Sequence, residues 1–234
     1  MNQKCLKWIL LAATLCCFEL SLKAQVFSQN IVGYYLLPIY AGDNYVANQF
    51  TNTDVSLNYI FTNGTPQGSS LIKWDIASGQ YLPVSTYDTN SGWSINYTLS
   101  LGEGAIFHSP TLFTNVFSGT VWPGLDLFGP FVPPVVQNGG LLSCVVPFTN
   151  ATFFDVIGRD PLTGESVTLL DALTQSSTTT TFDGESWNNG DPLLGIGQSA
   201  FYNLNSPDPV PEPNPCALLG VGTVLFAALR KRRK

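Results

Sequence analysis

Three tryptophans, Trp74, Trp93 and Trp187, combine with two aspartates in a pattern that suits sugar recognition. Asp88 and Asp183 each follow an aromatic residue and precede a tryptophan by a few positions. Exposed indole faces can stack on sugar rings while carboxylates accept hydrogen bonds from the sugar hydroxyls. One interpretation is therefore a sugar-stacking platform. In the other, which we favour because aromatic residues are more often buried, the aspartates cap turns and the tryptophans cover a small sheet.

Catalytic chemistry has little support in the sequence. A glycosidase needs two carboxylates on opposite sides of one bond, and Glu103 and Glu185 are the candidates that the chain offers. One histidine, His108, cannot form a zinc triad, and Cys144 lies in an apolar stretch typical of a buried strand. The sequence contains no nucleophile-elbow, zinc-protease or phosphate-loop motif. We expect no enzyme, no cofactor and no metal site.

The residues between the two ends of the chain have the composition of an all-β protein. Several runs are rich in Val, Ile, Thr, Tyr and Phe, and Asn-Gly and Asp-Gly turns separate them. These predicted strands are 45–50, 70–74, 105–108, 112–121, 141–148 and 178–182. Short helical turns are expected only after Asp54 and around 171–175. About 185 residues are enough to bury a core of their own.

An internal repeat organises this body. Residues 101–107 align with 196–202, and 71–75 align with 167–171 in the same order. We therefore expect two β-sandwich or barrel-like units, 25–116 and 117–205, either as tandem domains or as halves of one pseudo-symmetric fold. The recurring pairs resemble a module of secreted bacterial proteins with no assigned activity. In the first copy they are Lys73-Trp74, Tyr87-Asp88, Gly92-Trp93 and Gly102-Glu103-Gly104.

The second copy departs from the first at residues with chemical potential. Leu170 stands where the first copy has Trp74, and Gln198-Ser199 stands where it has Glu103-Gly104. A site that needs the Glu103 carboxylate therefore exists at most once.

Charge is distributed unevenly along the chain. Lys73 and Arg159 are the only basic residues between Gln25 and Pro215, against fifteen acidic ones, which gives this body a net charge of −13. It has no surplus of cations to exchange for counterions, so electrostatic binding to nucleic acid or anionic lipid is excluded.

Both ends of the chain carry targeting features. Lys4 and Lys7 precede an apolar run over 8–18, which predicts a signal peptide, residues 1–24, cleaved after Ala24. At the other end a Pro-rich linker, 206–215, precedes an apolar segment and a basic tail, 216–234. The fourteen residues of 216–229 would span roughly 21 Å as a helix, less than the ~30 Å of a bilayer core. The five cations that follow should remain on the cytoplasmic side.

The C-terminal arrangement resembles the sorting signal of the PEP-CTERM family of exported bacterial proteins. Three parts occur in order: Pro211-Glu212-Pro213, then Leu218-Leu219-Gly220-Val221-Gly222, then Arg230-Lys231-Arg232-Arg233-Lys234. The resemblance implies transient anchoring in the inner membrane, processing by an exosortase-type membrane protease, and release to the cell surface or extracellular matrix. It also implies an association with exopolysaccharide.

The expected function follows from these observations together. It is that of a non-enzymatic structural or adhesive protein of the cell surface or matrix. The alternatives are a carbohydrate-binding module and a polysaccharide-acting hydrolase.

Overall fold

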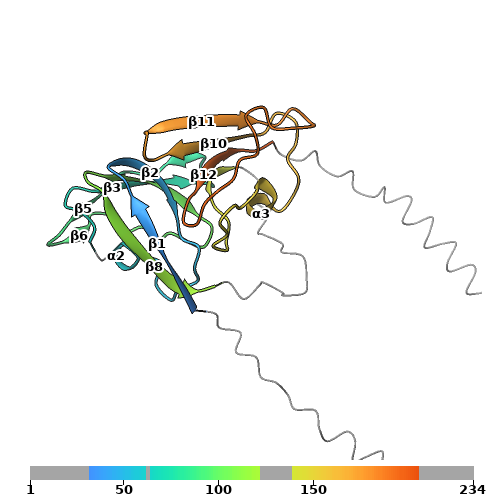
Figure 1. The fold of residues 1–234 in the computed structure, drawn as a ribbon. Helices are drawn as coiled ribbons and strands as arrows, with labels where there is room; N and C mark the ends of the chain where they lie inside the picture. Colours follow the sequence, from blue (N-terminus) through green and yellow to red (C-terminus); the bar gives the residue numbers. More distant parts are fainter. Residues whose placement is uncertain (1–31, 62–63, 122–138, 206–234) are drawn as a thin grey trace, which may run out of the picture. The chain divides into compact units, whose positions relative to one another are not determined.

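The computed structural model of the protein describes residues 32–61, 64–121 and 139–205 (Figure 1). Within these residues every strand pairing is antiparallel and only two short helices occur, which confirms the all-β class. The strands are β1 (Val32–Ile39), β2 (Gly42–Ala47), β3 (Ser70–Asp75), β4 (Gln80–Tyr81), β5 (Ser85–Asp88), β6 (Gly92–Trp93), β7 (Gly104–Ser109), β8 (Phe113–Thr120), β9 (Gly140–Leu142), β10 (Ser166–Asp171), β11 (Ser176–Thr181) and β12 (Ala200–Asn203). The helices are α2 (Leu57–Ile60) and α3 (Phe153–Ile157).

The expected signal helix, the Pro-rich linker and the hydrophobic helix with its basic tail lie outside the described residues. Among the described residues, no helix has the length and apolar character needed to cross a membrane.

Two of the sheets use the same order of strands. The first runs β2-β7-β3-β5-β6, with β4 paired to β3, and the second runs β9-β12-β10-β11. Under the sequence alignment above, β7 and β3 correspond to β12 and β10, and their neighbours in the strand order then make β2 equivalent to β9 and β5 equivalent to β11. A helix connects β2 to β3 and another connects β9 to β10, so the connections correspond as well.

The third sheet contains only β1 and β8, paired antiparallel from Val32 opposite Thr120 to Ile39 opposite Phe113. The boundary expected between residues 116 and 117 falls inside β8, whose pairing with β1 continues on both sides of it.

Hydrophobic side chains from these elements gather in two clusters. In β1, Tyr35, Leu37 and Ile39 are buried while Leu36 and Pro38 between them are exposed, which is the two-residue period of a half-buried strand. The first cluster is rich in aromatic side chains and includes Phe50, Phe61, Trp93, Phe107 and Phe117. The second cluster includes Cys144, Phe153, Ile157, Val167 and Tyr202.

Local side-chain chemistry explains the two helices. The carboxylate of Asp54 accepts a hydrogen bond from the amide of Ser56 just before α2, where a helical turn was expected. The second helix, α3, was not predicted; a capping box between Thr152 and Asp155 begins it, and Gly158 ends it with φ of 84°.

The helical turn expected at 171–175 is wrong. There the Asp171 carboxylate accepts from the amide of Leu173 and closes the hairpin between β10 and β11.

Hydrogen bonds join the two larger sheets in a reciprocal way. The amide of Ala47 donates to the Gly197 carbonyl at 2.9 Å, and the amide of Ser143 donates to the Gly102 carbonyl at 2.9 Å. Gly102 aligns with Gly197. Val46 pairs with Ala105 as Leu142 pairs with the aligned Ala200, so the next residues, Ala47 and Ser143, are equivalent, and the two hydrogen bonds are related by exchanging the two sheets. Two isolated β-bridges show the same relation: Val46 pairs with Gln198, and the equivalent residues Leu142 and Glu103 pair with each other.

Candidate functional site

The three tryptophans proposed for sugar stacking are not brought into one exposed row. Trp93 is only 5% exposed and packs in the first cluster, with ring centroids 5.8 Å from Phe107 and 6.2 Å from Phe61. Its indole nitrogen is buried without a hydrogen-bond partner in the described part of the chain. A buried ring offers no face to a ligand, so the assignment of Trp93 to a sugar-stacking site is wrong. Its aromatic surface contributes to the core instead.

The other two tryptophans occupy different surroundings. Trp187 is partly buried against the second cluster, 5.5 Å from the Phe153 ring and 5.4 Å from Phe182. Trp74 contacts Tyr81 and Phe201 edge-on, with centroid distances of 4.8 and 5.1 Å. The structure therefore places the three indoles among three separate groups of aromatic neighbours.

The two aspartates associated with these tryptophans cap turns, as the favoured interpretation predicts. Asp88 accepts hydrogen bonds from the amides of Asn90 and Ser91. Asp183 accepts from the amides of Glu185 and Ser186 at 2.8 Å each. These hydrogen bonds lower the pKa of the Asp183 carboxyl, so it stays ionised and engaged with the backbone.

The carboxylate suggested for catalysis at Glu103 is held in a polar cluster. The Lys73 ammonium lies 2.9 Å from the Glu103 carboxylate and donates to the Thr98 carbonyl at 2.6 Å. The amide of Ser100 donates to the same carboxylate at 2.7 Å. Glu185, the other candidate, is exposed in the turn that Asp183 caps after β11. The two carboxylates thus lie in loops next to different sheets, Glu103 just before β7 and Glu185 after β11, and do not share a described cleft.

Arg159, the other cation of the described residues, forms an ion pair with a fully buried carboxylate. Arg159 donates to both oxygens of Glu165, whose side chain is completely buried, and its guanidinium lies 5.9 Å from the centre of the Phe153 ring. Together with the Lys73–Glu103 pair, this ion pair engages every lysine and arginine of the described residues.

The remaining reactive groups are likewise engaged or buried. Burial raises the pKa of the Cys144 thiol to about 11, so it is protonated at neutral pH and a poor nucleophile. His108 Nδ1 lies 2.8 Å from the Asp43 carboxylate. Within the described residues, no three His, Cys, Asp or Glu side chains converge in a way that could hold a metal ion.

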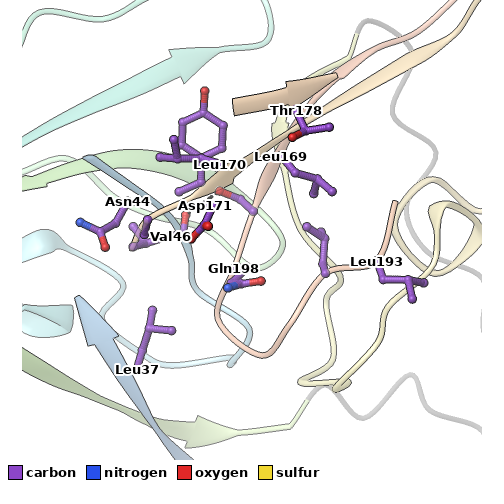
Figure 2. A pocket seen from close by; sticks show the side chains of 13 residues that line it. Leu37, Asn44, Val46, Leu169, Leu170, Asp171, Thr178, Leu193 and Gln198 are labelled. Atoms are coloured by element: carbon purple, nitrogen blue, oxygen red, sulfur yellow. Dashed lines mark hydrogen bonds between the residues drawn. The ribbon is translucent and has the colours of Figure 1, made fainter. Parts of the chain in front are cut away.

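A cavity of about 380 Å³ lies between β2 and β10, a size typical of small-molecule sites. In Figure 2, Leu37, Leu169 and Gln198 surround it from different elements. Its walls are mainly aliphatic with a polar minority, and no lysine, arginine or histidine lines it. The lining residues are Leu37, Asn44, Tyr45, Val46, Leu169, Leu170, Asp171, Ala172, Thr178, Leu193, Leu194, Gln198 and Ser199.

Sequence reasoning did not identify this cavity. A signal for it was present, since Leu170 and Gln198 are positions at which the second copy departs from the first. From the sequence alone, those departures indicate only the loss of a site that needs Glu103.

Comparison with known proteins adds no relative: no protein family, no curated protein and no solved structure matches the chain.

Proposed function

We propose that the chain is an exported, non-enzymatic protein of the bacterial cell surface or extracellular matrix, with a structural or adhesive role. Its body consists of two copies of one β unit. An exosortase-type membrane protease recognises its C-terminal end, and the inner membrane holds the chain only transiently.

The observation that carries the proposal is the ordered C-terminal sequence. Three features occur in order at this end of the chain: a Pro-Glu-Pro motif, an uncharged segment too short to span a bilayer core, and five consecutive cations. An apolar segment preceded by Lys4 and Lys7 at the other end supports export.

The chemistry of the body supports a role without catalysis. Lys73 and Arg159 are each bound to a glutamate, which leaves a surface dominated by carboxylates. Mutual repulsion between such bodies favours solubility outside the cell and disfavours contact with anionic polymers. Glu103 and Cys144, the groups closest to a catalytic role, are respectively ion-paired and buried.

The proposal of two copies is supported by the shared strand order of the two larger sheets and by their reciprocal hydrogen bonds. Gly104 and Ser199, which are aligned with each other, also touch: a Cβ built on Gly104 would lie 2.5 Å from the Ser199 Cβ. Two equivalent residues in contact lie close to an axis of pseudo-symmetry. We therefore favour halves of one pseudo-symmetric fold over tandem domains.

Mass spectrometry of the protein isolated from its native host tests this proposal. We expect a mature N-terminus near Gln25 and a C-terminus within or just before the Pro211–Pro213 motif. Glu212→Ala should retain the basic tail, whereas Pro209→Ala, just outside the motif, should be processed normally. Recovery of the intact tail Arg230–Lys234 on the wild-type surface protein would overturn the proposed sorting.

A further inference from the structure

The cavity between β2 and β10 has a counterpart on the other side of the molecule. Under the alignment of the two halves, β2 corresponds to β9 and β10 corresponds to β3. Exchanging the halves therefore carries the cavity to the space between β9 and β3. The two places occupy equivalent positions in the strand order, so one serves as a reference for the side chains and the strand pairing of the other.

The counterpart is filled by the chain itself. On β3, Lys73 pairs with Glu103 at 2.9 Å and donates to the Thr98 carbonyl at 2.6 Å. Trp74 covers Gly140, where an added Cβ would lie only 2.5 Å from the indole Cδ1, and Tyr81 packs edge-on against the same indole. The Trp74 indole thus fills the space against β9, and the half-exposed Tyr81 ring and the Lys73–Glu103 ion pair lie on either side of it in the sequence of β3 contacts.

At the cavity each of these groups is replaced. Leu169 and Gln198 stand in the positions of Lys73 and Glu103, which removes the ion pair. Leu170 and Ser177 stand in the positions of Trp74 and Tyr81, because Leu170 pairs with Ser177 as Trp74 pairs with Tyr81.

The backbone also opens at this point. In the first sheet, β3 pairs with β7 from Ser70 to Lys73, whereas β10 pairs with β12 only from Ser166 to Thr168. Lys73 pairs with Ala105, but the equivalent residues Leu169 and Ala200 of β10 and β12 are not paired. The Gln175 side chain accepts from the Asp43 amide at 2.7 Å and donates to the Asp43 carbonyl at 3.0 Å. These two hydrogen bonds join β2 to the turn between β10 and β11.

The lining indicates which ligand the space accepts. Leu37, Leu169 and Leu193 present aliphatic surface, which favours an apolar body. The amide oxygen of Gln198 accepts from the Gly195 amide, while its Nε2 makes no hydrogen bond within the described residues and remains a donor for a ligand. Asp171, the charged residue of the lining, is an acid, so an anionic ligand would meet repulsion and no counter-charge.

We propose that this cavity is a binding site for a small uncharged molecule with an apolar ring and a hydroxyl group, of the phenol type. Such a molecule supplies the kind of ring that Trp74 and Tyr81 provide on the opposite side, and its oxygen accepts from Gln198. The proposal is independent of how the protein is exported or sorted.

The test is a titration of the ¹⁵N-labelled full-length chain with p-cresol, the tyrosine side chain as a free molecule, followed by amide NMR shifts. We expect saturable shifts at Tyr45, Val46, Leu170 and Gln198. The anion p-toluate, of similar shape, should bind at least tenfold more weakly, and methyl β-glucoside should cause no saturable shift.

Two variants localise the binding. Leu170→Trp combined with Ser177→Tyr recreates the filled side and should weaken p-cresol binding at least tenfold. Gln198→Glu removes the amide donor with little change in volume and should weaken it about fivefold or more, so the test does not depend on the double variant folding. Leu112→Trp adds the same ring at an exposed position outside the lining and serves as the control; its affinity should be unchanged.

The proposal is overturned if p-cresol causes no saturable shift at these amides, if p-toluate or the glucoside binds as well as p-cresol, or if Gln198→Glu and the folded double variant retain wild-type affinity.

Discussion

At the scale of single residues, the Glu165 carboxylate needs compensating partners, because its side chain is completely buried. Besides the two bonds from Arg159, it accepts hydrogen bonds from the amides of Leu162 and Asn205. Burial acts to raise the pKa of this carboxyl, but the hydrogen bonds and the arginine charge outweigh it, and the pKa lies below its ordinary value of 4.5. The carboxylate is therefore stabilised in its charged form by the folded protein.

Arg159→Met should lower the free energy of unfolding at pH 7 by about 3–5 kcal/mol, because it leaves a buried carboxylate without its counter-charge. In the wild type the folded pKa of Glu165 is depressed, so its contribution is present above pH 4.5 and is lost as the pH falls through the folded pKa. In the variant burial dominates and protonation relieves the cost. The difference between the two proteins should thus shrink below about pH 5, as measured by urea unfolding at several pH values.

Lys73→Met is the matched control for this prediction, since it removes the other cation, whose Glu103 partner is 25% exposed. We expect a loss of about 1 kcal/mol or less with little dependence on pH in this range. Equal losses for the two variants would contradict the role assigned to burial at Glu165.

Residue-scale prediction from the sequence was uneven for a physical reason. The turn-capping role of Asp88 and Asp183 follows from local chemistry, since each carboxylate bonds amides two and three residues ahead, and it was predicted correctly. The burial of Trp93 depends on Phe61 and Phe107, which are distant in the sequence. Spacing alone could not distinguish this core ring from an exposed one.

Elements were predictable where the pattern of side chains is local. The strands β3, β7 and β8 were found at nearly their observed bounds. The strand expected over 141–148 ends at Leu142, because the next amide, that of Ser143, bonds the Gly102 carbonyl of the other half. Such a contact with the other half leaves no signal in the local sequence.

The connection between β10 and β11 carries the next prediction. Gln175 has a φ of 56°, an unfavourable conformation for a residue with a side chain, and its amide bonds Asp43 twice across the two halves. Gln175→Ala should lower the free energy of unfolding by about 1–3 kcal/mol, the contribution of two hydrogen bonds. Urea unfolding monitored by circular dichroism gives the value.

Gln175→Gly separates conformation from bonding, because glycine adopts positive φ without strain. If the hydrogen bonds to Asp43 stabilise the fold, the glycine variant should also be less stable than the wild type. Wild-type stability in both variants would show that the bonds across the halves contribute nothing.

At the scale of the whole molecule, the central question is whether the two clusters unfold together. All described residues belong to one compact unit, and polar contacts join the two larger sheets, which we propose to be equivalent halves. Gln49 makes two of these contacts: it is fully buried, accepts from the Gly197 amide at 2.8 Å and donates to the Ser143 hydroxyl at 3.1 Å. The sequence predicted the repeat but gave no means of choosing between independent and joined halves, since this choice depends on such long-range contacts.

Gln49→Leu keeps the volume of the side chain but leaves the buried Gly197 amide without an acceptor, so we expect a loss of about 1–3 kcal/mol. Amide hydrogen exchange of Phe107 in the first cluster and Tyr202 in the second distinguishes the two outcomes, because both exchange through global opening if the body is cooperative. Protection at both amides should then fall by the same factor. A fall confined to one of them would mean that the halves unfold separately and that the contacts at the axis hold together two independent domains.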